Sequence, residues 1–131
     1  MKKSGILHAQ LSGCVAALGH KDLFMVGDAG MPIPPGVTVI DLAVTKGVPT
    51  FRQVMDALLS EAAVEGCYLA EEIHEHNPEL HAYIKEKLRN VEYEYMPHDD
   101  LKKLSQKVRF AIRTGEFTPY PNVILRAGVV F

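Results

Sequence analysis

Residues 37–42 read Val37-Thr38-Val39-Ile40-Asp41-Leu42, residues 50–59 read Thr50-Phe51-Arg52-Gln53-Val54-Met55-Asp56-Ala57-Leu58-Leu59, and residues 66–70 read Gly66-Cys67-Tyr68-Leu69-Ala70. The first run is rich in β-branched residues and predicts a strand. The second predicts a helix to about Ala63, capped by Thr50, because its apolar residues fall on one face. The third predicts another strand. This order indicates an α/β layered domain with a largely parallel central sheet flanked by helices.

The same alternation extends in both directions along the chain. Before residue 37, the spacing of apolar residues predicts a helix over 8–18 with Gly19 as a left-handed stop, then a strand over 23–26 and a turn-rich loop over 28–36. After residue 70, it predicts a helix over 78–88 capped by Asn77, a strand over 91–95, a short helix over 99–104 and two closing strands over 108–112 and 123–125. Without repeats or flexible linkers, residues 1–131 are expected to form one domain.

Composition excludes several functional classes. The net charge of −2 gives no attraction toward nucleic acid or anionic membranes, and no apolar run approaches the length of a membrane span. The opening Met1-Lys2-Lys3 lacks the apolar stretch of a signal peptide, because Ser4, Gly5, His8 and Gln10 interrupt it. Cys14 and Cys67 are far apart in apolar surroundings, which indicates buried thiols in a reducing compartment. The sequence therefore predicts a cytoplasmic protein.

The most distinctive segment of the chain is a polar loop between the two closing strands, Arg113-Thr114-Gly115-Glu116-Phe117-Thr118-Pro119-Tyr120-Pro121-Asn122. Its glycine and prolines stiffen or bend the backbone, so it is neither a plain helix nor a central strand. It concentrates hydroxyl, carboxylate, guanidinium and amide groups. A rigid polar loop held between strands suits the binding of a small polyol.

Two other motifs suggest different chemistry. Gly27-Asp28-Ala29-Gly30 follows a strand, but the prolines after it prevent the helix that a phosphate-binding glycine loop requires. His74 and His76 would share one face of an extended segment and chelate a metal there. A third protein ligand is missing from that motif, and an exposed acidic loop before a helix explains the two histidines more simply. The sequence therefore predicts no metal and no cofactor.

The remaining candidates suit proton transfer and hydroxyl binding. His20 lies just past a helix end and is either a surface residue or a proton carrier, since free imidazole has a pKa near ~6.5. Asp28 follows a strand, where ligands bind in open α/β sheets, although aspartate there also forms turns. His98, Tyr120 and Asn122 would add hydrogen-bonding groups, or else satisfy local turns and caps. The set contains no nucleophile–base triad. Proton transfer and hydroxyl binding suit a reaction such as opening and closing a sugar hemiacetal.

With these residues in place, the chain closely resembles the family of ribose pyranases and fucose mutarotases along essentially its whole length. The segments that carry the resemblance are Lys3-Ser4-Gly5-Ile6-Leu7, Leu18-Gly19-His20, Asp28-Ala29-Gly30-Met31-Pro32-Ile33-Pro34, Asp41-Leu42, Pro49-Thr50-Phe51, residues 112–122 and Ile124-Leu125-Arg126-Ala127-Gly128-Val129-Val130-Phe131. The polar loop is the specific part. Two positions depart from the family: Pro121 replaces an alanine and biases Tyr120 toward an extended backbone, and His8 replaces a frequent asparagine.

The resemblance implies a pyranase that interconverts the pyranose and furanose forms of D-ribose without cofactor or metal. It implies that His20 is the proton donor, that Asp28, His98, Tyr120 and Asn122 bind the sugar, and that the protein is a cytoplasmic homodecamer with sites near subunit boundaries. Asp28 would either orient His20 or hold a hydroxyl. Three alternatives stay open: a fucose-type mutarotase, a non-catalytic sugar-binding accessory of ribose uptake, and a metal protein using His74 and His76.

Overall fold

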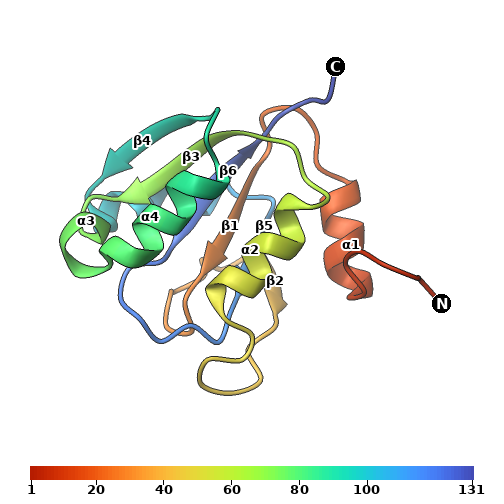
Figure 1. Cartoon of the computed structure of the whole chain (residues 1–131), viewed down its shortest axis with the longest axis horizontal. Coiled ribbons are helices and arrows are strands. Elements are labelled where there is room, and N and C mark those ends of the chain that lie inside the picture. The colour runs from red at the N-terminus through yellow and green to blue at the C-terminus, as the bar shows by residue number, and fades with distance from the viewer.

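Six strands form one mixed sheet at the centre of the computed structural model, which describes residues 1–131 (Figure 1). In the order β2-β5-β1-β6-β3-β4, the strands are β2 (Thr38–Asp41), β5 (Phe110–Arg113), β1 (Leu23–Gly27), β6 (Val123–Ala127), β3 (Val64–Ala70) and β4 (Glu92–Met96). Five of them run parallel, and β6 runs antiparallel to both neighbours, β1 and β3. The predicted fold class, with a largely parallel sheet flanked by helices, is confirmed.

Helices cover both faces of the sheet, because residues along each strand alternate between the faces. Phe24 and Val26 of β1 belong to a core beneath α1 (Ala9–Ala16), α2 (Phe51–Leu59) and α4 (Pro78–Lys87), which lie on one face (Figure 1). Met25 points to a smaller core on the other face, which contains Leu101 of α5 (His98–Leu104). The remaining short elements are α3 (Ile73–His76) and the 3₁₀ turn η1 (Ser105–Lys107). No helix combines the length and apolarity that crossing a membrane would require.

The predicted helix caps are mostly confirmed. Thr50 and Gln53 form a reciprocal capping box at the start of α2, with each side chain bonded to the other residue's backbone N–H. Asn77 accepts the backbone N–H of Leu80 and caps α4 as expected. His8, which stands where the resembled family often has asparagine, caps α1 in the same way, because its Nδ1 accepts the N–H of Leu11 at 3.1 Å.

Three local predictions are wrong. Gly19 is not a left-handed stop: α1 ends at Ala16, and the left-handed residue of the following turn is Lys21, with φ of 70°. Helix α2 ends at Leu59 rather than near Ala63. The segment expected as a loop before α4 contains the helical turn α3.

Candidate active site

The loop over residues 114–122 passes from the end of β5 to the start of β6, and β1 lies between those two strands. It therefore crosses the carboxyl end of β1, where Asp28 begins the next turn. Thr114 anchors the loop there, because its backbone N–H and its hydroxyl both donate to the carbonyl of Gly27, at 3.0 and 2.8 Å. The fold thus brings the polar loop and Asp28 to one edge of the sheet.

Asp28 and Asn122 hold each other in a fixed orientation at this edge. The Asn122 Oδ1 accepts the backbone N–H of Asp28 at 2.8 Å, and its Nδ2 donates to Asp28 Oδ2 at 2.9 Å. The other carboxylate oxygen of Asp28 accepts the N–H of Gly30 at 2.8 Å. Asn122 is buried, whereas Asp28 is half-buried and lines a hollow of about 350 Å³ with Ala29, Gly30 and residues 116–118. Each carboxylate oxygen can accept a further hydrogen bond, so a ligand hydroxyl has a pre-oriented acceptor here.

Gly27 has a steric role in this arrangement. A Cβ there would lie 3.1 Å from Asn122 Oδ1 and 3.0 Å from Met31 Cβ, and both distances are shorter than an ordinary van der Waals contact. The glycine therefore makes room for Asn122 beside Asp28. A turn over Ala29 and Gly30 and then an irregular segment follow Asp28 instead of a helix, in agreement with the rejection of a nucleotide-binding loop.

Tyr120 packs between two imidazoles. Its ring centroid lies 5.1 Å from that of His98 in an edge-to-face arrangement, and 5.3 Å from that of His76. The backbone of Tyr120 has φ of 60°, so this residue does not follow the extended bias that Pro121 imposes on the residue before it. A left-handed non-glycine residue stores strain of about 1–3 kcal/mol, and such residues cluster at ligand sites.

His98 is the first residue of α5, and its backbone N–H donates to the Glu72 carboxylate at 3.1 Å. Burial first, and the nearby Lys102 ammonium second, lower the pKa of its imidazole. The Asp28 carboxylate is close enough to act on that pKa in the opposite direction. Nδ1 of His98 is buried and has no hydrogen-bond partner in the chain. Buried polar atoms normally have a partner, so the hydrogen-bonding capacity of this nitrogen is unused within the single chain.

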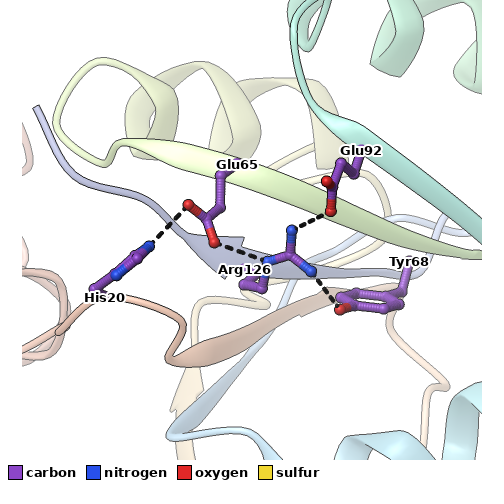
Figure 2. A network of polar contacts seen from close by, with 5 residues as sticks. All are labelled: His20, Glu65, Tyr68, Glu92 and Arg126. Atoms are coloured by element: carbon purple, nitrogen blue, oxygen red, sulfur yellow. Dashed lines mark hydrogen bonds and ion pairs between the residues drawn. The ribbon is translucent and has the colours of Figure 1, made fainter.

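His20 lies at the opposite edge of the sheet. It precedes β1 whereas Asp28 follows it, and a five-residue strand spans about 17 Å. Its side chain is half exposed, with Nε2 at 3.0 Å from Glu65 Oε2 (Figure 2). It borders a separate hollow of about 730 Å³ with Lys21, Glu65, residues 90–92 and Arg126. One chain therefore brings together Asp28, His98, Tyr120 and Asn122 but does not bring His20 to them.

Two anchors of the polar loop were missed in the sequence. Asn77 was read only as a helix cap, yet its Nδ2 also donates to Thr118 Oγ1 at 3.0 Å and to the carbonyl of Pro119 at 2.8 Å. Glu116 accepts the N–H of Phe51 at 3.1 Å and the hydroxyl of Thr118 at 3.0 Å. No sequence pattern marks the contacts of Asn77 with the loop or of Glu116 with Phe51, because both join segments far apart in the chain.

The geometry expected for a metal at His74 and His76 is not found. Both residues lie on the helical turn α3, where side chains two positions apart do not face each other. His76 packs on Tyr120, while the ring of His74 packs on His81 and Tyr95. No three His, Cys, Asp or Glu side chains are grouped closely enough to hold a metal ion.

Comparison with known proteins identifies relatives that match from end to end. The model of the RbsD / FucU transport protein family matches residues 1–130. The D-ribose pyranase of Limosilactobacillus fermentum is 51% identical over 131 residues and D-ribose pyranase 2 of Streptomyces griseus is 52% identical over 134, with all of each chain covered. The Bacillus subtilis RbsD structure complexed with D-ribose superposes with a TM-score of 0.96 at 44% identity, covering 100% of both chains. FucU from Bifidobacterium longum shares the fold at 21% identity, with a TM-score of 0.78 over 95% of this chain and 96% of its own.

Proposed function

This chain belongs to the RbsD/FucU family, and we propose that it is a D-ribose pyranase, an isomerase that interconverts the β-pyranose and β-furanose forms of D-ribose. The observation that carries the proposal is the identity of about half of all residues with proteins named D-ribose pyranase, over the full length of both chains. The polar groups at the carboxyl edge of the sheet suit a polyol. A fucose-type mutarotase is disfavoured, because the fucose mutarotase from Streptococcus pneumoniae is only 19% identical.

The sugar-binding groups in this proposal are Asp28, His98, Tyr120 and Asn122. The Asp28 carboxylate accepts a sugar hydroxyl, since Asn122 and Gly30 already fix its orientation. This favours hydroxyl binding over the alternative in which Asp28 orients the His20 of its own chain. The unpartnered Nδ1 of His98 bonds a second hydroxyl, and the Tyr120 phenol a third.

The proton donor is His20 of a neighbouring copy in a homo-oligomer, for which the family resemblance suggests a decamer. Two features of the single chain support this arrangement. His20 is half exposed at the edge opposite the sugar-binding groups, so a second copy can present it there. The apolar C-terminal tail extends away from the sheet, with Val130 and Phe131 fully exposed, as expected of a contact between copies (Figure 1).

The reaction needs only proton transfer. The His20 imidazolium gives a proton to the ring oxygen as the bond from that oxygen to the anomeric carbon breaks. The anomeric hydroxyl releases its proton to water and becomes the aldehyde carbonyl, and the imidazole is reprotonated from solvent. Closure through a different hydroxyl reverses these transfers and gives the other ring size. Positioned acid–base catalysis contributes roughly 10²–10⁴-fold.

The proposed compartment is the cytoplasm. Cys14 and Cys67 are both free thiols, which suits a reducing environment. Burial raises the pKa of the Cys67 thiol to about 12, so it is not a reactive nucleophile.

Exchange NMR on D-ribose tests this function directly. Saturation transfer between the pyranose and furanose signals measures the catalysed rate, and a panel of aldoses that includes fucose measures specificity. The wild-type protein should accelerate the exchange of ribose, and His20→Ala should lose most of the acceleration while its fold is retained. His74→Ala, an exposed histidine whose ring packs on His81 and Tyr95 and on no proposed sugar-binding group, is the matched control and should remain active. Binding of ribose without faster exchange would instead indicate a non-catalytic accessory.

A further inference from the structure

His20 is the first member of a chain of polar contacts that crosses the amino edge of the parallel strands (Figure 2). Its Nε2 lies 3.0 Å from Oε2 of Glu65, and Oε1 of the same carboxylate accepts the Nε–H of Arg126 at 3.0 Å. The Arg126 guanidinium is held in turn by Glu92, at 2.5 Å, and by the Tyr68 hydroxyl, at 3.1 Å. Both oxygens of Glu65 are therefore engaged, one by the histidine and one by a fixed arginine.

The backbone is adapted to this contact at Glu65. The pairing of β3 with β6 shifts between Val64, which faces Ala127, and Gly66, which faces Arg126, so Glu65 is the extra residue of a β-bulge. Bulges redirect a side chain and are frequent next to active sites. Regular alternation would place Glu65 and Gly66 on opposite faces of the sheet, whereas the bulge lets the Glu65 carboxylate reach Arg126, which faces Gly66.

Gly66 provides the space for Arg126. A Cβ at this position would lie 3.0 Å from Cζ, 3.1 Å from Nε and 3.2 Å from Cβ of Arg126. A side chain at residue 66 would press against the guanidinium where it lies across β3, so the glycine favours this placement. The bulge and the glycine thus both serve to bring a braced carboxylate against His20.

Stability alone is a weak explanation for this arrangement. The side chains of His20 and Glu65 are 46% and 31% exposed, and solvent-exposed ion pairs contribute little to folding. The contact between His20 and Glu65 matters more for the orientation of the imidazole than for the free energy of folding. The pKa of Glu65 is lowered, first by its hydrogen bond with His20, so the carboxylate is ionised and can only accept. Nε2 of His20 must therefore carry a hydrogen.

We propose that Glu65, braced by Arg126, is a positioning residue that fixes the His20 tautomer, so that Nδ1 is the nitrogen that exchanges a proton with the sugar. The inference rests on the proposed function, in which His20 is the proton donor. The neutral imidazole carries its hydrogen on Nε2, facing Glu65. The proton given to the ring oxygen is the one that Nδ1 carries in the imidazolium, and Nδ1 regains it from solvent.

The tautomer can be measured without any assay of activity. Proton–nitrogen correlation NMR on ¹⁵N-histidine-labelled protein, at a pH where His20 is neutral, distinguishes a protonated Nε2 from a protonated Nδ1; His20→Ala identifies the signals. The expected result is a single tautomer with hydrogen on Nε2. A predominant Nδ1–H tautomer, or an unrestrained mixture, would overturn the proposal even if the enzyme exchanges ribose normally.

Variants at residue 65 connect the tautomer to catalysis. Glu65→Ala should give mixed tautomers and lower kcat for ring exchange by roughly 10- to 100-fold, with KM changed less than about twofold. Glu65→Gln keeps an acceptor oxygen and should recover part of both losses. Glu79→Gln, an exposed acid on α4 that removes the same charge far from His20, is the matched control and should behave as wild type.

The outcomes separate the two proposals. Wild-type kcat in both Glu65 variants, with His20→Ala inactive, would refute the positioning role and leave the pyranase function intact. An active His20→Ala variant would refute the assignment of the proton donor itself. An equal loss of activity in Glu79→Gln would also refute the positioning role, because it would indicate a general effect of charge.

Discussion

At the scale of single residues, the candidate site depends on side chains whose orientation is fixed before any sugar arrives. Asp28 and Asn122 share two hydrogen bonds, and Tyr120 is packed against His98. Groups held in place in this way lose little conformational entropy on binding. His98 is the exception in its hydrogen bonding, because its buried Nδ1 has no partner.

His98 also makes stability depend on pH. Its pKa is lowered in the native state by burial and by Lys102, whereas an unfolded histidine has a pKa near ~6.5. As the pH falls through ~6.5 the unfolded chain binds a proton before the native chain does, so the free energy of unfolding decreases toward acid pH. His81, whose pKa is also lowered by burial, acts with the same sign.

Urea unfolding between about pH 7 and about pH 5 measures this effect. His98→Gln should reduce the loss of stability over that interval, because glutamine has no proton to bind. An unchanged pH slope in the variant would contradict the assignment of a lowered pKa to His98. The unpartnered nitrogen also predicts weaker ribose binding by the variant at every pH.

At the scale of elements, the Asn77 side chain connects the start of α4 to the polar loop through hydrogen bonds. This buried side chain caps α4 and donates to Thr118 and Pro119. Asn77→Ala removes the cap and both loop contacts, and should lower the free energy of unfolding by about 1–3 kcal/mol and raise KM for ribose.

Asn77→Asp separates the two roles of this residue. A carboxylate still caps the helix and interacts favourably with its amino terminus, but it cannot donate to the carbonyl of Pro119. The variant should lose less stability than Asn77→Ala and show a similar increase in KM. Wild-type KM in Asn77→Asp would show that the loop does not need these contacts. Denaturant unfolding and exchange kinetics on the same samples provide both values.

The sequence predicted the elements well because their signals are local. Thr50 and Asn77 are strong helix caps, and the apolar strands are bounded by glycine and proline. The antiparallel direction of β6 could also be predicted from the sequence, since residues 114–122 are too few for the crossover that a parallel return from β5 requires. The bulge at Glu65 and the turn α3 could not be predicted, because each depends on contacts across the sheet or with the polar loop.

The site residues were predicted with less support from local signals. The pairing of Asp28 with Asn122 joins residues far apart in sequence, and it follows from the strand order, which places β6 beside β1. The same order puts His20 at the other edge of the sheet. Residue types and spacing do not specify strand order, so sequence reasoning grouped all five residues without revealing that one chain separates them.

At the scale of the whole molecule, the two edges of the sheet carry complementary halves of the proposed site. In the proposal, the carboxyl edge would bind the sugar through Asp28, His98, Tyr120 and Asn122. The amino edge presents His20, whose imidazole contacts the Glu65 carboxylate that Arg126 holds. A closed ring of copies with head-to-tail contacts would join each amino edge to a neighbour's carboxyl edge. Analytical ultracentrifugation should accordingly give a mass several times the 14.5 kDa of one chain.

Mixing two inactive variants tests the central claim most directly. His20→Ala retains the sugar-binding edge, and Asp28→Asn retains His20, so each alone should fail to accelerate ribose exchange. If the copies are unfolded together and reassembled at equal amounts, random assembly should restore about one quarter of wild-type activity, because about one site in four receives both intact halves. Reassembled mixtures that show the expected oligomer mass but no recovered activity would contradict the account.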